Sequence, residues 1–305
     1  MQFLAAFIMK GRMQAIMVAS AFALLSLVLP PVSIISSAAV ALVTLRLGPQ
    51  EGFWVLLAGS LAAALLSTVL LGSYQFALLY SVLLWLPVAI IAWVLRNTRS
   101  LAVALESAVG LATLVVLAFY ALQADVAGFW LQILDAMTQS MQTANPDVAI
   151  DTLKESAEIF AHYMTGGIAA GSVFGLLFGL FLARGWQANL YNPGGFVQEY
   201  KALKSHQLLA IISLVLAVIA ALASGLIAEI SLNVLLVLFV LYTVVGAAFL
   251  HTAFSGMKSS RFMVPFLYVT VLLIAHVMAL VAVLGLLEAV LDLRTKFNLN
   301  GNASS

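Results

Sequence analysis

The chain has 305 residues, of which 64% are hydrophobic and 8% are charged, and its mean hydropathy is +1.13. Because about a quarter of the residues of a soluble globular protein are charged, this composition predicts an all-α, polytopic transmembrane helical bundle. The formal net charge of +1 excludes a basic nucleic-acid-binding domain, and the absence of cysteine excludes disulfides, thiolate metal sites and thiol catalysis.

Apolar runs between charged or turn-forming residues predict the membrane segments. A helix needs about 20 apolar residues to cross a hydrocarbon core of about 30 Å. The second run has only 14 residues, and Pro30 and Pro31 separate it from the first, so it is either a short span or a re-entrant segment. We therefore expect eight to nine segments within nine runs, which are 13–29, 32–45, 53–72, 74–95, 100–122, 162–183, 206–228, 231–254 and 262–287.

The charges between these segments predict an orientation with the N-terminus in the cytoplasm and the C-terminus outside. Ten of the thirteen basic residues then lie on the cytoplasmic side, as the positive-inside rule requires. They are Lys10, Arg12, Arg46, Arg96, Arg99, Arg184, Lys201, Lys204, Lys258 and Arg261. The outer side receives Lys154, Arg294 and Lys296 together with nine of the twelve acids, namely Asp125, Asp135, Asp147, Asp151, Glu155, Glu158, Glu229, Glu288 and Asp292.

Residues 124–161 form an extracytoplasmic region between an N-terminal bundle, residues 1–123, and a C-terminal bundle, residues 162–305. Apolar residues at helical spacing in its first half predict an amphipathic helix in the outer interface. Asn145-Pro146 predicts the start of a second, acidic helix over residues 147–160. Helices that lie on lipid are preferred here to a lid over an outer cavity.

Gly167, Gly171, Gly175 and Gly179 recur every four residues and therefore share one face of segment 162–183. Small residues at this spacing allow membrane helices to pack closely, so we interpret them as a glycine zipper. The partner helix belongs either to this chain or to a second copy. Sliding of helices, as transporters require, is the alternative to simple packing.

The motif Asn192-Pro193-Gly194-Gly195-Phe196 lies in the predicted cytoplasmic loop 184–205. Proline presets its own φ angle and glycine readily takes the positive φ that follows, so the motif predicts a tight turn. A loop anchored by aromatic residues at headgroup depth is the simpler interpretation. A docking surface for a cytoplasmic partner is the alternative.

Ionisable residues inside membrane segments are costly, so each is a candidate functional group. Glu106 and His251 lie at equal predicted depth below the cytoplasmic surface, where they could hydrogen-bond, relay protons or bind a substrate. Tyr120 shares the helical face of Glu106, and Asn233 shares that of His251. His276 lies near the predicted midplane. A hydrogen-bonded pair that only sets helix register is the alternative interpretation.

Three motifs resemble the YybS-like predicted membrane proteins of bacteria, a family of unknown function. They are Phe7-Ile8-Met9-Lys10-Gly11-Arg12-Met13-Gln14-Ala15, Leu45-Arg46-Leu47-Gly48 with Glu51-Gly52, and the Asn192–Phe196 motif with Glu199-Tyr200. The resemblance covers nearly the whole chain. It implies a bacterial inner-membrane location and a distant kinship to the substrate-binding membrane subunits of energy-coupling-factor transporters, and it implies no catalytic residues.

The leading hypothesis is a transporter or a substrate-binding membrane subunit for a small molecule or lipid, with a pocket between the fifth, sixth, eighth and ninth segments. The alternative is a scaffold or assembly factor that acts through loop 184–205. An enzyme is not expected, because the sequence contains no GxSxG, HExxH, Walker A or GxGxxG motif. We expect no cofactor and no metal, and as partners the lipid bilayer and either a second copy or a membrane-complex partner.

Overall fold

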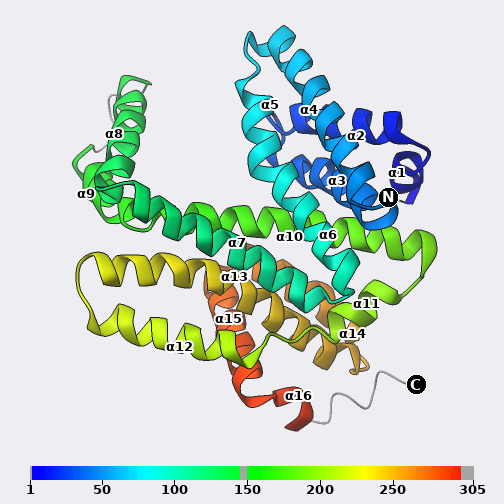
Figure 1. The fold of residues 1–305 in the computed structure, drawn as a ribbon. Coiled ribbons are helices and arrows are strands. Elements are labelled where there is room, and N and C mark those ends of the chain that lie inside the picture. The colour runs from blue at the N-terminus through cyan, green and yellow to red at the C-terminus, as the bar shows by residue number, and fades with distance from the viewer. Residues whose placement is uncertain (1, 145–149, 297–305) are drawn as a thin grey trace. The chain divides into compact units, whose positions relative to one another are not determined.

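The structure, a computed structural model, describes residues 2–144 and 150–296 (Figure 1). This part of the chain forms helices joined by turns and contains no strand, which confirms the all-α fold class. The predicted start of a helix at Asn145-Pro146 lies outside the described residues. Six described helical segments are long and apolar enough to cross a membrane: Pro30–Leu47, Pro49–Leu71, Gln75–Thr98, Leu101–Leu122, Met164–Tyr191 and Leu226–Ser255.

The expected eight to nine spans are not confirmed, because three of the nine predicted segments do not form one continuous helical segment long enough to cross a membrane. The first becomes α2, Arg12–Leu25, with 14 residues, and the seventh becomes α12, Gln207–Leu222, with 16 residues. Both are shorter than the length of about 20 residues that a straight crossing needs. The ninth is broken into two helices, which add a seventh span only if they count together.

Large apolar side chains cover the outer faces of several helices. Exposed examples on α4, Pro49–Leu71, and on α12 are Leu57, Leu61, Leu65, Val69, Leu208, Ile211, Val215 and Val218. Apolar surface in water costs about 25 cal/mol per Å², and soluble proteins rarely expose it in long continuous stripes. Contact with lipid removes this cost, so the exposed side chains support a membrane-embedded protein.

The described chain divides into two compact units, which are discontinuous in sequence. Unit 1 comprises residues 1–108, 172–205 and 241–305, and unit 2 comprises residues 109–171 and 206–240. Three helices contribute to both units: α7, Leu101–Leu122, α10, Met164–Tyr191, and α13, Leu226–Ser255. The units therefore do not coincide with the continuous regions 1–123, 124–161 and 162–305 predicted from sequence.

Helix α3, Ser33–Leu47, is the central helix of the N-terminal part of unit 1. Every residue from 36 to 45 is buried, and α3 packs against α2, α4 and α6, Leu86–Thr98. Its serines and alanines allow this close packing, and Ser36 joins two neighbouring elements. The Ser36 hydroxyl donates to the carbonyl oxygen of Ala19 at 2.7 Å and accepts from the indole nitrogen of Trp85 at 3.0 Å. The segment predicted as short or re-entrant thus forms a core helix, which the 3-10 turn Pro30–Val32 lengthens.

The fourth predicted segment consists of three helical pieces. They are α5, Gln75–Tyr80, a π-helical turn, Ser81–Trp85, and α6. Pro87 has no amide hydrogen to donate to the preceding turn, and the chain changes to π-helical hydrogen bonding just before it. A short helix, α1, Gln2–Ile8, precedes these elements and packs against α2 and α3.

Unit 2 contains the two helices of the predicted extracytoplasmic region, α8, Val126–Ala144, and α9, Ile150–Ala161, which pack against each other (Figure 1). The amphipathic first helix agrees with the sequence prediction. Helix α9 ends in a turn before Met164, in which the amide of Tyr163 donates to the carbonyl oxygen of Phe160 at 2.9 Å. The acidic helix therefore does not continue into α10.

Most of the predicted loop 184–205 is helical. Helix α10 continues past Arg184 to Tyr191, and α11, Gly195–Lys201, begins four residues later. Gly194 lies between them with a φ angle of +85°, as predicted for the glycine after Pro193. The turn therefore joins two helices instead of standing within a long loop.

The C-terminal segment bends by 111° between α14, Ser260–Leu273, and α15, Ala275–Leu291, and the short α16, Leu293–Lys296, follows. After this bend, the Lys204 ammonium lies 2.5 Å from a carboxylate oxygen of Asp292. The guanidinium of Arg294 donates to the carbonyl oxygen of Lys201 at 2.5 Å. Asp292 and Arg294, predicted on the side opposite Lys201 and Lys204, therefore contact these two residues, because the ninth segment is bent and not a single straight helix.

Candidate functional site: an aromatic cavity in unit 1

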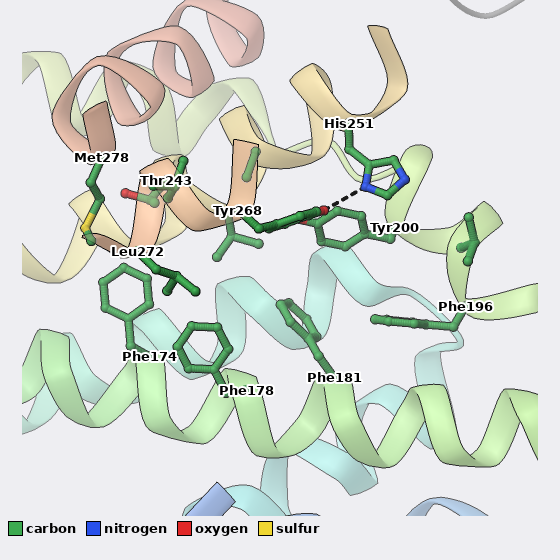
Figure 2. A pocket seen from close by; sticks show the side chains of 14 residues that line it. Phe174, Phe178, Phe181, Phe196, Tyr200, Thr243, His251, Tyr268, Leu272 and Met278 are labelled. Carbon is green, nitrogen blue, oxygen red and sulfur yellow. Dashed lines mark hydrogen bonds between the residues drawn. The ribbon is translucent and has the colours of Figure 1, made fainter. Parts of the chain in front are cut away.

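A cavity of about 490 Å³ lies within unit 1, and we call it the aromatic cavity (Figure 2). Helices α10, α11, α13, α14 and α15 contribute its walls, which are almost entirely apolar. The lining residues are Phe174, Phe178, Phe181, Phe196, Val197, Tyr200, Thr243, Val244, Ala247, His251, Tyr268, Val271, Leu272 and Met278.

Three phenylalanines of α10 form one wall of the aromatic cavity. Phe174, Phe178 and Phe181 are spaced by four and three residues, so they share one helical face, and all three point from α10 into the cavity in Figure 2. The rings of Phe174 and Phe178 stack with centroids 6.1 Å apart. This spacing is visible in the sequence, but the prediction for this helix rested on its glycines and did not include the aromatic face.

The turn after α10 brings a second set of rings to the cavity. Phe196 and Tyr200 on α11 each lie with their ring centroids 5.9 Å from that of Phe181. Arg184 and Glu199 hold the two helices together through a bidentate ion pair, in which Nε lies 2.8 Å from one carboxylate oxygen. Phe196, predicted as part of a partner-contact loop, therefore lines the cavity, whereas Asn192, Pro193 and Gly194 are exposed.

Gly195 is the second glycine of the same motif, and it is buried. A Cβ atom at Gly195 would collide with the side-chain amide of Asn192. The backbone amide of Gly195 also donates to the carbonyl oxygen of Asn192 at 3.0 Å. The motif is thus a compact turn whose structural effect is to direct α11 back over α10.

Polar groups gather at one end of the aromatic cavity. His251 Nδ1 lies 2.7 Å from the hydroxyl of Tyr268, and the ring of His251 meets those of Tyr200 and Tyr268 edge to face (Figure 2). Burial raises the pKa of the Tyr200 phenol well above its usual 10, so this hydroxyl stays protonated. His251, a predicted site residue, therefore lies in the cavity with Tyr200 and Tyr268, which were not predicted as site residues.

Glu106 and His251, predicted as a possible pair, have different described partners. The Ser205 hydroxyl donates to a Glu106 carboxylate oxygen at 3.1 Å, whereas His251 pairs with Tyr268. Equal depth along two helices does not determine which way each side chain turns. His276 lies exposed at the start of α15, immediately after the bend, and does not line the aromatic cavity.

Unit 2 contains a separate polar cluster that includes the predicted residues Tyr120 and Asn233. The Asn233 amide nitrogen donates to the Tyr120 hydroxyl at 2.9 Å, and Tyr120 donates to a Glu229 carboxylate oxygen at 2.8 Å. His162 Nδ1 lies 2.6 Å from the other Glu229 oxygen. Tyr120 and Asn233 were both predicted as site residues, but together with Glu106 and His251. Glu229 and His162 were not predicted as site residues, because both lie at predicted segment ends.

Asn233 is fully buried and also binds the beginning of α10. Its Oδ1 accepts a hydrogen bond of 2.6 Å from the amide of Gly166, and Gly166 has no space for a Cβ against the Asn233 backbone. The first amides of a helix have no acceptor within that helix, so Asn233 supplies one from α13. The cluster is satisfied internally, and it joins α7, α10 and α13.

Among residues 2–144 and 150–296, the expected glycine seam has a packing neighbour at one of its four positions. A Cβ at Gly179 would lie 2.9 Å from the Ser37 side chain, but a Cβ at Gly167, Gly171 or Gly175 would meet no atom within 4 Å. A close helix crossing instead involves two glycines outside the predicted seam, Gly246 and Gly285. A Cβ at Gly246 on α13 would overlap the Val281 carbonyl oxygen, and one at Gly285 on α15 would overlap that of Tyr242. Glycine spacing on one helix cannot reveal which face has a neighbour.

Comparisons with known proteins do not identify the site. No protein-family model matches the chain, and searches of curated proteins and of solved structures find no similar protein. The resemblance of the N-terminal and Asn192–Phe196 motifs to YybS-like proteins therefore stays a prediction. Among the described residues, no three histidine, aspartate or glutamate side chains are grouped as a metal site requires. The candidate site is interpreted from its geometry.

Proposed function

We propose that this chain is a bacterial inner-membrane protein that binds an apolar small molecule or a lipid chain in the aromatic cavity. Such binding would suit a transporter or a substrate-binding membrane subunit. The cavity itself carries the proposal: its volume of about 490 Å³ is within the range of about 300–1,000 Å³ typical of ligand sites. Its lining offers rings and methyl groups but few polar atoms, so a charged ligand would lose hydration without compensation.

Selectivity in such a site would depend on shape more than on hydrophobicity. A ligand that arrives from lipid is already in an apolar solvent, so burial alone gives little driving force. The rings of Phe174, Phe178 and Phe181 offer close dispersion contacts that mobile acyl chains do not. The hydroxyls of Tyr200 and Tyr268 beside His251 could orient one polar group at the end of the ligand.

The orientation that we propose retains the cytoplasmic N-terminus and moves the C-terminal helix to the same side. Lys204 and Asp292 are in contact, so both belong to the cytoplasmic side if the loop after α10 does. Arg294 and Lys296 then also lie on the cytoplasmic side. This orientation agrees better with the positive-inside rule than the orientation predicted from the sequence, in which both residues lie outside.

Photolabelling tests the proposed ligand site. The purified full chain in nanodiscs would be illuminated with a diazirine-bearing palmitic acid, and labelled peptides would be mapped by mass spectrometry. We expect labels on the cavity-facing parts of α10 and α14. Val244→Phe fills the cavity from α13 and should weaken labelling about tenfold, equivalent to ~1.4 kcal/mol of binding free energy. Val269→Phe adds the same bulk at an exposed position of α14 and is the matched control.

Equal labelling of cavity peptides in the wild type and in Val244→Phe would refute the site. If Val244→Phe does not fold, Phe178→Trp adds a smaller volume at a half-exposed position and decides the same question. Loss of labelling in both the Val244→Phe and Val269→Phe variants would also count against the cavity, because only one of them changes it.

A scaffold role is the second candidate, and one observation favours it. Tyr191, Asn192, Pro193 and Gly194 are all exposed at the turn between α10 and α11. Crosslinking from a photoreactive residue at position 192 tests this role. A stoichiometric partner that is lost in Gly194→Val, where the φ of +85° disfavours a branched side chain, would support it. Crosslinks to lipid alone would reject it.

A further inference from the structure

A second cavity in unit 1, of about 570 Å³, has a different chemistry from the aromatic cavity, and we call it the arginine cavity. Four arginines line it: Arg46 from α3, Arg96 from α6, Arg99 from the end of α6, and Arg184 from α10. The carboxylate in its lining is that of Glu199. Four guanidinium groups against one carboxylate leave an excess of positive charge in a concave site.

Two of the four arginines have structural partners. Arg184 forms its bidentate pair with Glu199 and donates to the side-chain carbonyl of Gln187 at 2.7 Å. Arg96 donates to the carbonyl oxygens of Leu45 and Arg46, at 2.6 and 2.8 Å, and so caps the negative end of the α3 dipole. These contacts hold the cavity walls together. Arg96 also compensates the partial negative charge of the two carbonyl oxygens, which would otherwise repel an anion.

The other two arginines remain available to a ligand. The Arg46 guanidinium lies over the ring of Tyr191, 4.0 Å from its centroid, which orients the planar group but neutralises no charge. Arg99 is exposed at the end of α6, where its backbone amide donates to the carbonyl oxygen of Leu95 at 2.9 Å. Within residues 2–144 and 150–296, its guanidinium group has no described hydrogen bond or ion pair. Its φ of +53° is a conformation that glycine would adopt more easily. Arg99 therefore contributes to the edge of the cavity a guanidinium group that is paired with no other described side chain.

We propose that the arginine cavity binds a phosphate group. A guanidinium group can donate two parallel hydrogen bonds to the oxygens of a phosphate. Two such groups at one concave site can therefore make more charge-assisted hydrogen bonds than a single surface arginine. The phosphate could belong to a soluble phosphate ester or to the headgroup of an anionic phospholipid, since both present the same oxygens. This site shares no lining residue with the aromatic cavity, so it does not depend on the function proposed above.

The first experiment measures binding of pyrophosphate to the detergent-purified full chain by calorimetry at about 0.15 M salt, where long-range charge effects are largely screened. We expect Arg46→Gln and Arg99→Gln each to weaken binding about tenfold, since a charge-assisted hydrogen bond is removed. Arg261→Gln removes an exposed arginine of α14 that is outside the cavity and should leave binding unchanged.

The second experiment tests whether the bound phosphate belongs to a phospholipid headgroup. Nanodiscs of phosphatidylcholine with and without phosphatidylglycerol would be compared by native mass spectrometry, which counts retained lipids. Retention of phosphatidylglycerol by the wild type and its loss in the Arg46→Gln, Arg99→Gln double variant would assign the site to a headgroup. Pyrophosphate binding with the same variant dependence would assign it to a soluble phosphate.

Two outcomes would overturn the proposal. One is that neither ligand binds the wild type, and the other is that Arg261→Gln weakens binding as much as the cavity variants do. If the double variant is not folded by size exclusion and thermal unfolding, the single Arg99→Gln variant decides the test, because its side chain supports no described contact.

Discussion

Lys204 and Asp292 form an ion pair, with Nζ 2.5 Å from Oδ1, across 88 residues of sequence. The hydrogen bond from Lys204 lowers the pKa of Asp292 below its usual 3.8. The pair joins the residues that follow α11 to the end of α15, so both lie at the same face of unit 1. The bend of 111° between α14 and α15 makes this contact possible, because it turns the last apolar segment back on itself.

The first prediction is that the turn after α10 and the end of the described C-terminal helix are on the same side of the membrane. The chain contains no cysteine, so single cysteines can be introduced without background. Asn192→Cys and Lys296→Cys should show the same reactivity toward a membrane-impermeant maleimide in intact cells. Tyr163→Cys, at the other end of α10, should show the opposite reactivity. A Lys296→Cys that behaves like Tyr163→Cys would contradict the contact between Lys204 and Asp292.

The second prediction concerns the buried pair of Glu288 and Arg294, each at most 2% exposed, with Arg294 Nε 3.3 Å from a Glu288 oxygen. Glu288→Gln leaves a buried guanidinium that cannot lose its proton, so we expect a loss of about 3–5 kcal/mol in thermal or denaturant unfolding. Adding Arg294→Met should restore part of this loss, because the unpaired charge is removed. Lys204→Met, at an exposed pair, is the control and should change stability little. If Glu288→Gln unfolds like the control, the pair does not stabilise the fold.

The third prediction separates glycines that pack closely from those that do not. Gly246→Ala forces a methyl group against the Val281 carbonyl of α15, which should destabilise the protein by about 1–3 kcal/mol. Gly171→Ala places the same methyl group in open space and should be neutral or slightly stabilising, because alanine favours helix. Thermal unfolding of the two variants in one detergent compares them directly. A larger loss from Gly171→Ala would show that the predicted seam binds a second copy or another helix.

The fourth prediction concerns the polar cluster of unit 2. Asn233→Leu removes the acceptor of the Gly166 amide at the start of α10 and the donor to Tyr120, so we expect a loss of about 1–3 kcal/mol in unfolding free energy. Tyr120→Phe should cost about 1 kcal/mol, since Glu229 retains His162 as a partner. Tyr74→Phe alters an exposed tyrosine and should have no effect. Faster hydrogen exchange in the first turn of α10 in Asn233→Leu would locate the damage, and unchanged exchange would contradict the capping role.

The sequence by itself determined the helical class and the approximate positions of the helices. Apolar runs and the charges between them are local properties, and a residue's depth along a helix follows from a rise of about 1.5 Å per residue. Local chemistry also determined the turn at Gly194, whose positive φ follows from Pro193 and the glycine itself. The polar cluster of unit 2 was also predicted in part, because two of its members, Tyr120 and Asn233, were candidate site residues.

Only the tertiary structure decided which side chains meet. Glu106 and His251 lie at equal predicted depth, yet their described partners are Ser205 and Tyr268, because depth does not determine the rotation of a helix about its axis. Gly171 and Gly246 look alike in the sequence, but only Gly246 has another backbone beside it. The bend at Ile274 likewise placed Asp292 beside Lys204. Each of these contacts joins residues far apart in the chain, so it depends on how all the helices pack together and not on any local pattern.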